Sequence, residues 1–388
     1  MQASSDPSKV TLDTASELLV EIGQRSAEID EARRIPDDLF DSLVAAGYCR
    51  MLVPRRHGGP ELGLPAALRV IEALARADGS VGWTVGQVQL AHLIFACLPE
   101  TAQRTIYAHG PDTTGAGAVA PKGRATPQED GHWRVTGQWP FITGCEASSW
   151  VYLNTMVFDG RSLRTTPEGQ PETRMVVVPT KQMEILDTWS VMGLRGTGSH
   201  DGRLSGHSCA EDHTFTLRPG EPGSDRAIHR IAQSGLIIAA SAIGIAQGAL
   251  DEIVTLATGG KRPAFGSRRL AESPLFHDRL GEAAATVRAA RALLHTESEA
   301  AWTVDGAEAA PLDHAALRAS AARAVALAVT ATDTAHNLGG GSAVYDHSPL
   351  QRRLRDIHTA SQHFVAGRDM YAALGAVLAE VETKPGTP

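Results

Sequence analysis

The chain has 388 residues, which is too long for one ordinary hydrophobic core, so we expect two or three packed subdomains. Its net charge is −8, with acidic and basic residues interspersed, and this argues against a nucleic-acid partner. The four cysteines stand alone, without a pair or a metal-binding spacing. We therefore predict reduced thiols, a cytoplasmic protein and no metal site.

The first part of the chain, residues 1–110, is predicted to be a helical domain. Apolar residues recur at three- and four-residue steps along most of it. Pro36, followed by two aspartates, is typical of a helix start, and Gly47 is typical of the end of that helix. The segments "LPAALRVIEALARADGS" and "VGWTVGQVQLAHLIFACLPE" predict two more amphipathic helices.

The middle part, residues 111–227, is predicted to be a β domain. Gly, Thr, Pro and Val become more frequent, and three segments alternate like strands: "HWRVTGQWPFITG", "SSWVYLNTMVF" and "TRMVVVP". The segment "RTTPEGQPET" has the composition of a surface hairpin or loop.

The last part, residues 228–388, is predicted to be a bundle of four long helices, at 230–257, 272–300, 312–338 and 356–381. The apolar stretch 234–250 is too short to span a bilayer, which needs about 20 apolar residues. We interpret it as a buried core helix. Because the first residues show no signal-peptide pattern, we expect neither export nor a membrane partner.

Five separated segments carry a resemblance to a known superfamily. They are "VPRRHGGPELGLPAALRVIEALARADGSVGW", "PKGRATPQEDGHWRVTGQWPFITGCEASSW", "DTWSVMGLRGTGSHDG", "RPAFGSRRLAESP" and "HNLGGGSAVYDHSPLQRRLRDIH", in that order. Together they resemble the acyl-CoA dehydrogenases. The resemblance implies an α+β fold with an N-terminal helical domain, a middle β-barrel and a C-terminal four-helix bundle.

Within that superfamily, "WPFITGCEASSW", "GLRGTGSHD" and "GGGSAVYDHSPLQRRLRDIHTASQH" resemble the two-component flavin-dependent monooxygenases (group D). The resemblance implies an enzyme that binds reduced flavin, FADH2 or FMNH2, from a separate flavin reductase. It would form a flavin C4a-hydroperoxide with O2 and oxygenate a small aromatic, polyketide, indole or amine substrate. The family also implies a homotetramer.

The residue that a dehydrogenase would need is missing. In most dehydrogenases of this superfamily the catalytic Glu lies nine residues after the Arg of the Arg–Asp pair, and here that residue is Phe364. A minority place the Glu near the position of His229. A dehydrogenase with another base, first suspected at Asp251 or Glu252, remains an alternative, as does a flavin-binding protein without turnover.

The resemblance places two residues at the reacting atoms. His363 would lie beside flavin C4a, where a neutral imidazole could deprotonate a phenol or hydrogen-bond to a hydroperoxide, since histidine titrates near neutral pH. Thr143 would face flavin N5 and C4a. His358 lies five residues from His363, off its face of a continuous helix, so we expect it to be structural.

The same resemblance assigns further contacts. Those with the cofactor would come from Gly144, Arg262, Phe265, Gly339, Gly340 and Gly341. Trp139 would either pack on the isoalloxazine edge or be a buried core residue. Arg262 and Phe265 match a turn that contacts the adenosine diphosphate part of FAD, and the glycine loop would meet the cofactor of a neighbouring subunit. Trp83 and His92, on one helix, are predicted to line the substrate pocket.

Overall fold

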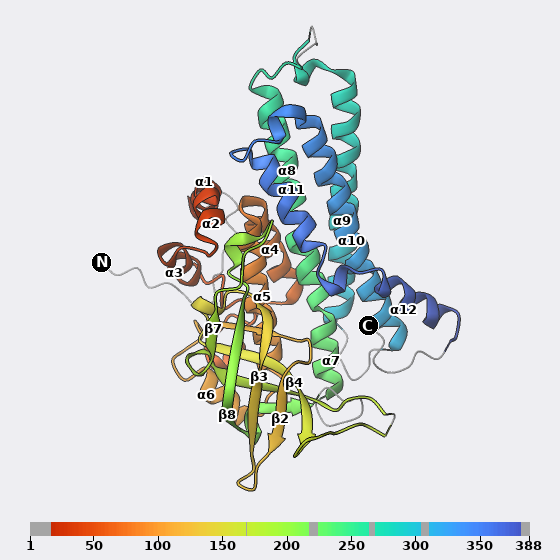
Figure 1. Ribbon diagram of the computed structural model, residues 1–388. Coiled ribbons are helices and arrows are strands. Elements are labelled where there is room, and N and C mark those ends of the chain that lie inside the picture. The colour runs from red at the N-terminus through yellow and green to blue at the C-terminus, as the bar shows by residue number, and fades with distance from the viewer. Residues whose placement is uncertain (1–16, 168, 217–223, 264–267, 304–309, 382–388) are drawn as a thin grey trace.

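The structure is a computed structural model that describes residues 17–167, 169–216, 224–263, 268–303 and 310–381. Helices come first in the chain, strands follow, and a second set of helices ends it (Figure 1). The predicted α+β class and the order of its three parts are confirmed. The exact domain boundaries stay a prediction.

The N-terminal part is helical, as predicted. Its helices are α1 (Glu17–Gln24), α2 (Ser26–Ala32), α3 (Asp37–Ala45), α4 (Leu64–Ala77), α5 (Gly79–Phe95) and α6 (Glu100–Ile106). Pro36 directly precedes α3, and Gly47 follows it with a φ of 82°, a left-handed conformation that suits glycine. In α5 every residue except Gln87 is buried, so this helix lies at the centre of the molecule.

The middle part is one nine-stranded sheet with the strand order β7-β8-β3-β2-β4-β6-β9, while β1 and β5 pair with β4. The strands are β1 (Gly115–Ala118), β2 (Arg124–Pro127), β3 (His132–Ile142), β4 (Trp150–Asp159), β5 (Ser162–Leu163), β6 (Thr173–Pro179), β7 (Glu184–Leu186), β8 (His200–Ala210) and β9 (Thr214–Thr216). Within the described ranges this path has two ends, so the expected barrel is an unclosed sheet. One face forms its own core, while Tyr152, Met175 and Val177 on the other face join the helical core.

The C-terminal part consists of α7 (Ser224–Ala232), α8 (Ser234–Thr258), α9 (Pro274–Thr303), α10 (Pro311–Gly339), α11 (Pro349–Ala360) and α12 (Asp369–Leu378). Residues 228–258 are long and apolar enough to cross a membrane, but 78% of the most apolar stretch is buried. The predicted core helix at 234–250 is therefore confirmed, and α8 packs among α4, α5, α9, α10 and α11 (Figure 1).

One element differs from the prediction: the fourth bundle helix, expected at 356–381, is two helices. The chain leaves α11 after Ala360, passes through a single 3-10 turn at Phe364–Ala366 and enters α12 at Asp369. His363 has φ −64° and ψ 138°, which is extended backbone. His358 and His363 therefore do not belong to one continuous helix, and the prediction that they lie on different faces of such a helix was wrong. His358 does have a structural partner, because its Nε2 lies 2.8 Å from Asp333 Oδ1.

Candidate functional site

Three predicted residues from distant parts of the chain meet between the helices and the sheet. Trp83 comes from α5, Thr143 follows β3, and His363 lies in the break between α11 and α12. The indole Nε1 of Trp83 donates to Thr143 Oγ1 at 3.4 Å. The Trp83 and His363 rings meet edge to face, with centroids 5.7 Å apart. Trp83 and Thr143 are buried, and His363 is half-buried.

A chain of hydroxyl groups continues from Thr143 away from Trp83. Thr143 Oγ1 lies 2.8 Å from Ser199 Oγ, and Ser199 Oγ lies 2.8 Å from Thr197 Oγ1. Thr197 Oγ1 donates to the backbone carbonyl of Leu194 at 2.8 Å. All three hydroxyl side chains are buried. In the sequence, Ser199 and Thr197 are part of the motif "GLRGTGSHD", and no local signal shows that their hydroxyl groups lie next to Thr143.

The loop that holds this hydroxyl chain is attached to α11. Leu194 has a φ of 51°, which is uncommon for a residue with a side chain, and its N–H donates to Asp356 Oδ1 at 2.6 Å. The preceding Gly193 packs so closely on α11 that an added Cβ would lie 2.1 Å from the Arg355 carbonyl oxygen. Only a residue without a Cβ fits there.

Asp356 belongs to a group of buried charges behind the site. Arg353, Asp356 and Asp78 are each less than 5% exposed. Arg353 donates to the carbonyls of residues 75, 76 and 77 at the end of α4, and Asp78 accepts from two N–H groups at the start of α5. Burial, and then the nearby Asp78 carboxylate, raise the pKa of Asp356 to about 7.

The environment of His363 keeps its imidazole neutral. Burial lowers the pKa of His363 to about 4. Its Nδ1 accepts from the backbone N–H of Val365 at 3.5 Å, so the proton of the neutral ring is assigned to Nε2. His363 thus presents a hydrogen-bond donor rather than a base in this tautomer.

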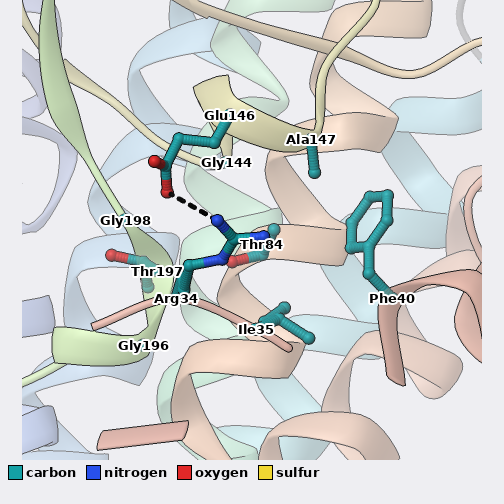
Figure 2. Close-up of a pocket in the computed structure, with 10 residues that line it drawn as sticks. All are labelled: Arg34, Ile35, Phe40, Thr84, Gly144, Glu146, Ala147, Gly196, Thr197 and Gly198. Carbon is teal, nitrogen blue, oxygen red and sulfur yellow. Dashed lines mark ion pairs between the residues drawn. The ribbon is translucent and has the colours of Figure 1, made fainter. Parts of the chain in front are cut away.

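A small solvent-open cleft adjoins the hydroxyl chain, and Figure 2 shows the residues around it. It is lined by Arg34, Ile35, Phe40, Thr84, Gly144, Glu146, Ala147, Gly196, Thr197 and Gly198. Arg34 and Glu146 point toward each other at 3.9 Å. The buried hydroxyl of Thr84 in this wall has no hydrogen-bond partner in the described part of the chain.

Trp139 is a core residue of the sheet. Its side chain is wholly buried in the core of the sheet, and its Nε1 donates to the Asn154 carbonyl at 2.7 Å. In this conformation the predicted contact of Trp139 with the isoalloxazine edge cannot form, because no part of its ring is exposed.

Phe141, which sequence analysis did not consider, has the exposed ring that Trp139 lacks. It lies two residues before Thr143, is 68% exposed and has a φ of 63°. Strained backbone and an exposed aromatic ring are common where a ligand binds. Gly144, next along the chain, also has a positive φ, of 67°, and an added Cβ would lie 3.0 Å from Thr84. This segment can receive a flat aromatic group, so the residues present fit a flavin ring.

Both ring nitrogens of His92 have hydrogen-bond partners inside the protein. Its Nδ1 lies 2.9 Å from the Tyr107 hydroxyl and its Nε2 lies 2.8 Å from the Cys49 carbonyl. The residue is 1% exposed, and burial lowers its pKa to about 4. Both ring nitrogens are occupied, so this arrangement leaves His92 no atom for the predicted contact with substrate.

The remaining predicted cofactor residues lie elsewhere. Gly339 ends α10, and Gly340 and Gly341 are exposed just after it. These glycines precede α11 and His363 follows it. Because a 12-residue helix is about 18 Å long, the glycines and His363 lie at opposite ends of α11. Arg262 is exposed shortly after α8, and Phe265 lies outside the described residues. A contact of these residues with a neighbouring subunit's cofactor stays a prediction.

The suspected alternative bases are also distant. The start of α8 lies next to the segment that carries His363, because a Cβ added at Gly235 would be 4.0 Å from Val365 Cβ. Asp251 is 16 residues further along α8, about 24 Å at the rise of an α-helix. Its carboxylate is bound by Arg76 at 2.5 Å. Neither Asp251 nor the adjacent Glu252 can serve a reaction beside His363.

Comparison with known proteins shows the family of this chain. Residues 9–107 match the family model "Acyl-CoA dehydrogenase, N-terminal domain", and residues 236–368 match "Acyl-CoA dehydrogenase, C-terminal domain". The chain is 32% identical to an indole-3-acetate monooxygenase of Pseudomonas putida, covering 93% of this chain and 92% of the relative. It is 28% identical to the oxygenase component of an FADH(2)-dependent resorcinol hydroxylase of Rhizobium sp., covering 91% and 89%.

Among solved structures, the 3-HSA hydroxylase from Rhodococcus sp. RHA1 has a TM-score of 0.88 at 23% identity, with 100% of both chains covered. That likeness supports the fold. The chain belongs to the flavin-dependent monooxygenases with the acyl-CoA dehydrogenase fold, and it is the oxygenase component, dependent on reduced flavin, of a two-component system.

Proposed function

We propose that this enzyme inserts one oxygen atom of O2 into a small aromatic substrate at the site between Trp83, Thr143 and His363. The observation that carries the proposal is the meeting of a hydroxyl chain and a neutral imidazole at one buried indole. In the described part of the chain, no hydrogen bond or ion pair of these three residues involves a carboxylate. Proton abstraction next to a thioester would require such a base.

Reduced flavin, when bound, would supply the two electrons and, at its C4a position, the oxygen-carrying group. The protein must hold that group and keep water away. Thr143 would face N5, and the Nε2–H of His363 would donate to the group at C4a. The indole of Trp83 and the exposed ring of Phe364 supply apolar surface around His363, which limits entry of water.

A planar aromatic compound is the substrate class that we favour over a polyketide or an aliphatic amine. Two relatives that match nearly the full chain are named for indole-3-acetate and resorcinol, both flat rings. Edge-to-face and stacking contacts with Trp83 and Phe364 would orient such a ring.

The assembly and location complete the proposal. A separate flavin reductase supplies the reduced cofactor. Four chains associate, so that the glycine loop at 339–341 of one subunit meets the cofactor of the next. The enzyme works in the cytoplasm, where its four free cysteines stay reduced.

Rapid mixing of the anaerobic protein and reduced flavin with oxygenated buffer tests the proposal. We expect a transient near-ultraviolet absorbance that lasts for seconds and decays faster when an accepted phenol or indole is added. His363→Ala should shorten that lifetime, whereas His358→Ala, a histidine bound to Asp333 away from Trp83, should leave it unchanged. Reoxidation at the rate of free flavin in the wild type would refute the proposed function.

A further inference from the structure

We infer that Ser199 and Thr197 orient the hydroxyl of Thr143 as a hydrogen-bond acceptor, so that the site selects reduced over oxidised flavin. The inference rests on the proposed function, which places Thr143 against flavin N5. It assigns a role in cofactor specificity to two residues that do not themselves contact the flavin.

The orientation begins at the Leu194 carbonyl, which can only accept. Thr197 Oγ1 lies 2.8 Å from it and therefore commits its single proton to that bond. The carbonyl is well fixed, because it also accepts from Trp189 Nε1 at 3.2 Å and because the Leu194 N–H is bound to Asp356.

Each following hydroxyl has only one choice left. Ser199 Oγ, 2.8 Å from Thr197 Oγ1, must donate to it, because the Thr197 proton is already used. Thr143 Oγ1, 2.8 Å from Ser199 Oγ, must then donate to Ser199. The Trp83 indole, which can only donate, takes one lone pair of Thr143. Thr143 is left with one free lone pair and no proton.

This orientation distinguishes the two redox states of the cofactor. N5 of reduced flavin carries a hydrogen and can donate to the free lone pair of Thr143. N5 of oxidised flavin carries only a lone pair, so the two acceptors would face each other without a proton between them. A lost neutral hydrogen bond corresponds to about three- to tenfold in affinity.

Such selection suits a two-component enzyme. The oxygenase must take reduced flavin from the reductase and release oxidised flavin after turnover. An acceptor at N5 favours both steps, because the bond that holds the reduced form is lost when N5 loses its hydrogen.

The test compares dissociation constants for oxidised and reduced flavin, the latter measured anaerobically. In Ser199→Ala the Thr143 proton is free to turn toward N5. We expect oxidised flavin to bind about three- to tenfold more tightly, with little change for reduced flavin. Thr197→Val should shift the ratio in the same direction, and Thr197→Ser, which keeps the hydroxyl, should restore the wild-type ratio.

Ser241→Ala is the matched control, since it removes a buried serine hydroxyl whose one hydrogen bond to the described residues lies within α8, to the Ile237 carbonyl. An unchanged ratio in Ser199→Ala would overturn the inference, and so would equal behaviour of Thr197→Ser and Thr197→Val. Failure of the proposed function is separate: there the wild type itself would not bind reduced flavin or would give no transient with oxygen.

Discussion

Replacing Asp356 with Asn should make the enzyme more stable at alkaline pH while preserving its fold. The Asp356 carboxyl is 2% exposed and accepts from the Leu194 N–H. An amide of the same shape can accept from the same N–H without charge, so the loop that carries Thr197 and Ser199 should stay in place. The flavin affinity ratio should accordingly not change.

The size of the effect follows from the pKa of Asp356, which burial raises from 3.8 to about 7. The folded state therefore binds this proton more tightly than the unfolded state does. The resulting stabilisation is full below about pH 4 and is lost as pH rises through 7. Between pH 5 and pH 8 the loss is about 2–3 kcal/mol. For 388 residues the unfolding entropy is about 0.8 kcal/mol/K, so the melting temperature changes by about 3 °C.

The assay is thermal unfolding of wild type and Asp356→Asn at pH 5, 6, 7 and 8. Groups common to both proteins cancel in the difference, which should move by about 3 °C in favour of the variant toward pH 8. Asp38→Asn is the control: Arg25 lowers the pKa of the exposed Asp38, so its difference should be flat over this range. A flat difference for Asp356→Asn would mean that Arg353 keeps Asp356 ionised throughout, and the reasoning would be refuted.

Three further predictions concern single side chains. Because burial lowers the pKa of His363 to about 4, the product formed per flavin oxidised should be constant from pH 6 to 8, and a sigmoidal pH profile would contradict a neutral ring. His363→Ala should lower the product formed per flavin oxidised, with a matching rise in H2O2. Phe141→Asn should leave the free energy of unfolding unchanged or raise it by about 1 kcal/mol, since Asn tolerates positive φ, and it should weaken flavin binding severalfold. Thermal unfolding measures the first effect and flavin titration the second, and Phe141→Tyr, which keeps an aromatic ring, should retain binding. His92→Leu should destabilise the fold by about 1–3 kcal/mol, because it leaves the buried Tyr107 hydroxyl without its hydrogen-bond partner, whereas the Cys49 carbonyl still accepts from Gln89 Nε2. The yield per flavin oxidised should be unchanged at low temperature, and a lower yield in folded protein would return His92 to the substrate site.

The sequence was sufficient for much of the fold. Helical periodicity located α4, α5 and the three long bundle helices, and alternation located β3, β4 and β6. It did not reveal the break at 361–368, because apolar and polar residues there still fit a helical pattern. The break is set by tertiary contacts, since Val365 is buried against the start of α8.

The choice of Trp139 over Phe141 has a related cause. In a regular strand the two residues would lie on the same face, because side chains alternate with a period of two. The pairing of β3 with β8 shifts register between Trp139 and Ile142, at the residue whose φ is 63°. The irregularity turns Phe141 outward while Trp139 stays in the core. No local sequence signal identifies such a bulge, so the sequence did not show that Phe141 rather than Trp139 has the exposed ring.

The same limit applies to Ser199 and Thr197, and it shows what the fold adds to the motif. The stretch "GLRGTGSHD" identifies the family, but the direction of its hydroxyl bonds depends on one carbonyl held from α11 by Asp356. A fixed donor–acceptor order along Thr143, Ser199 and Thr197 is a tertiary property, because the three side chains come from two separate loops. The sequence thus predicts which residue faces the flavin, whereas the packing of α11 on the 193–199 loop sets the hydrogen-bond direction that we infer for it.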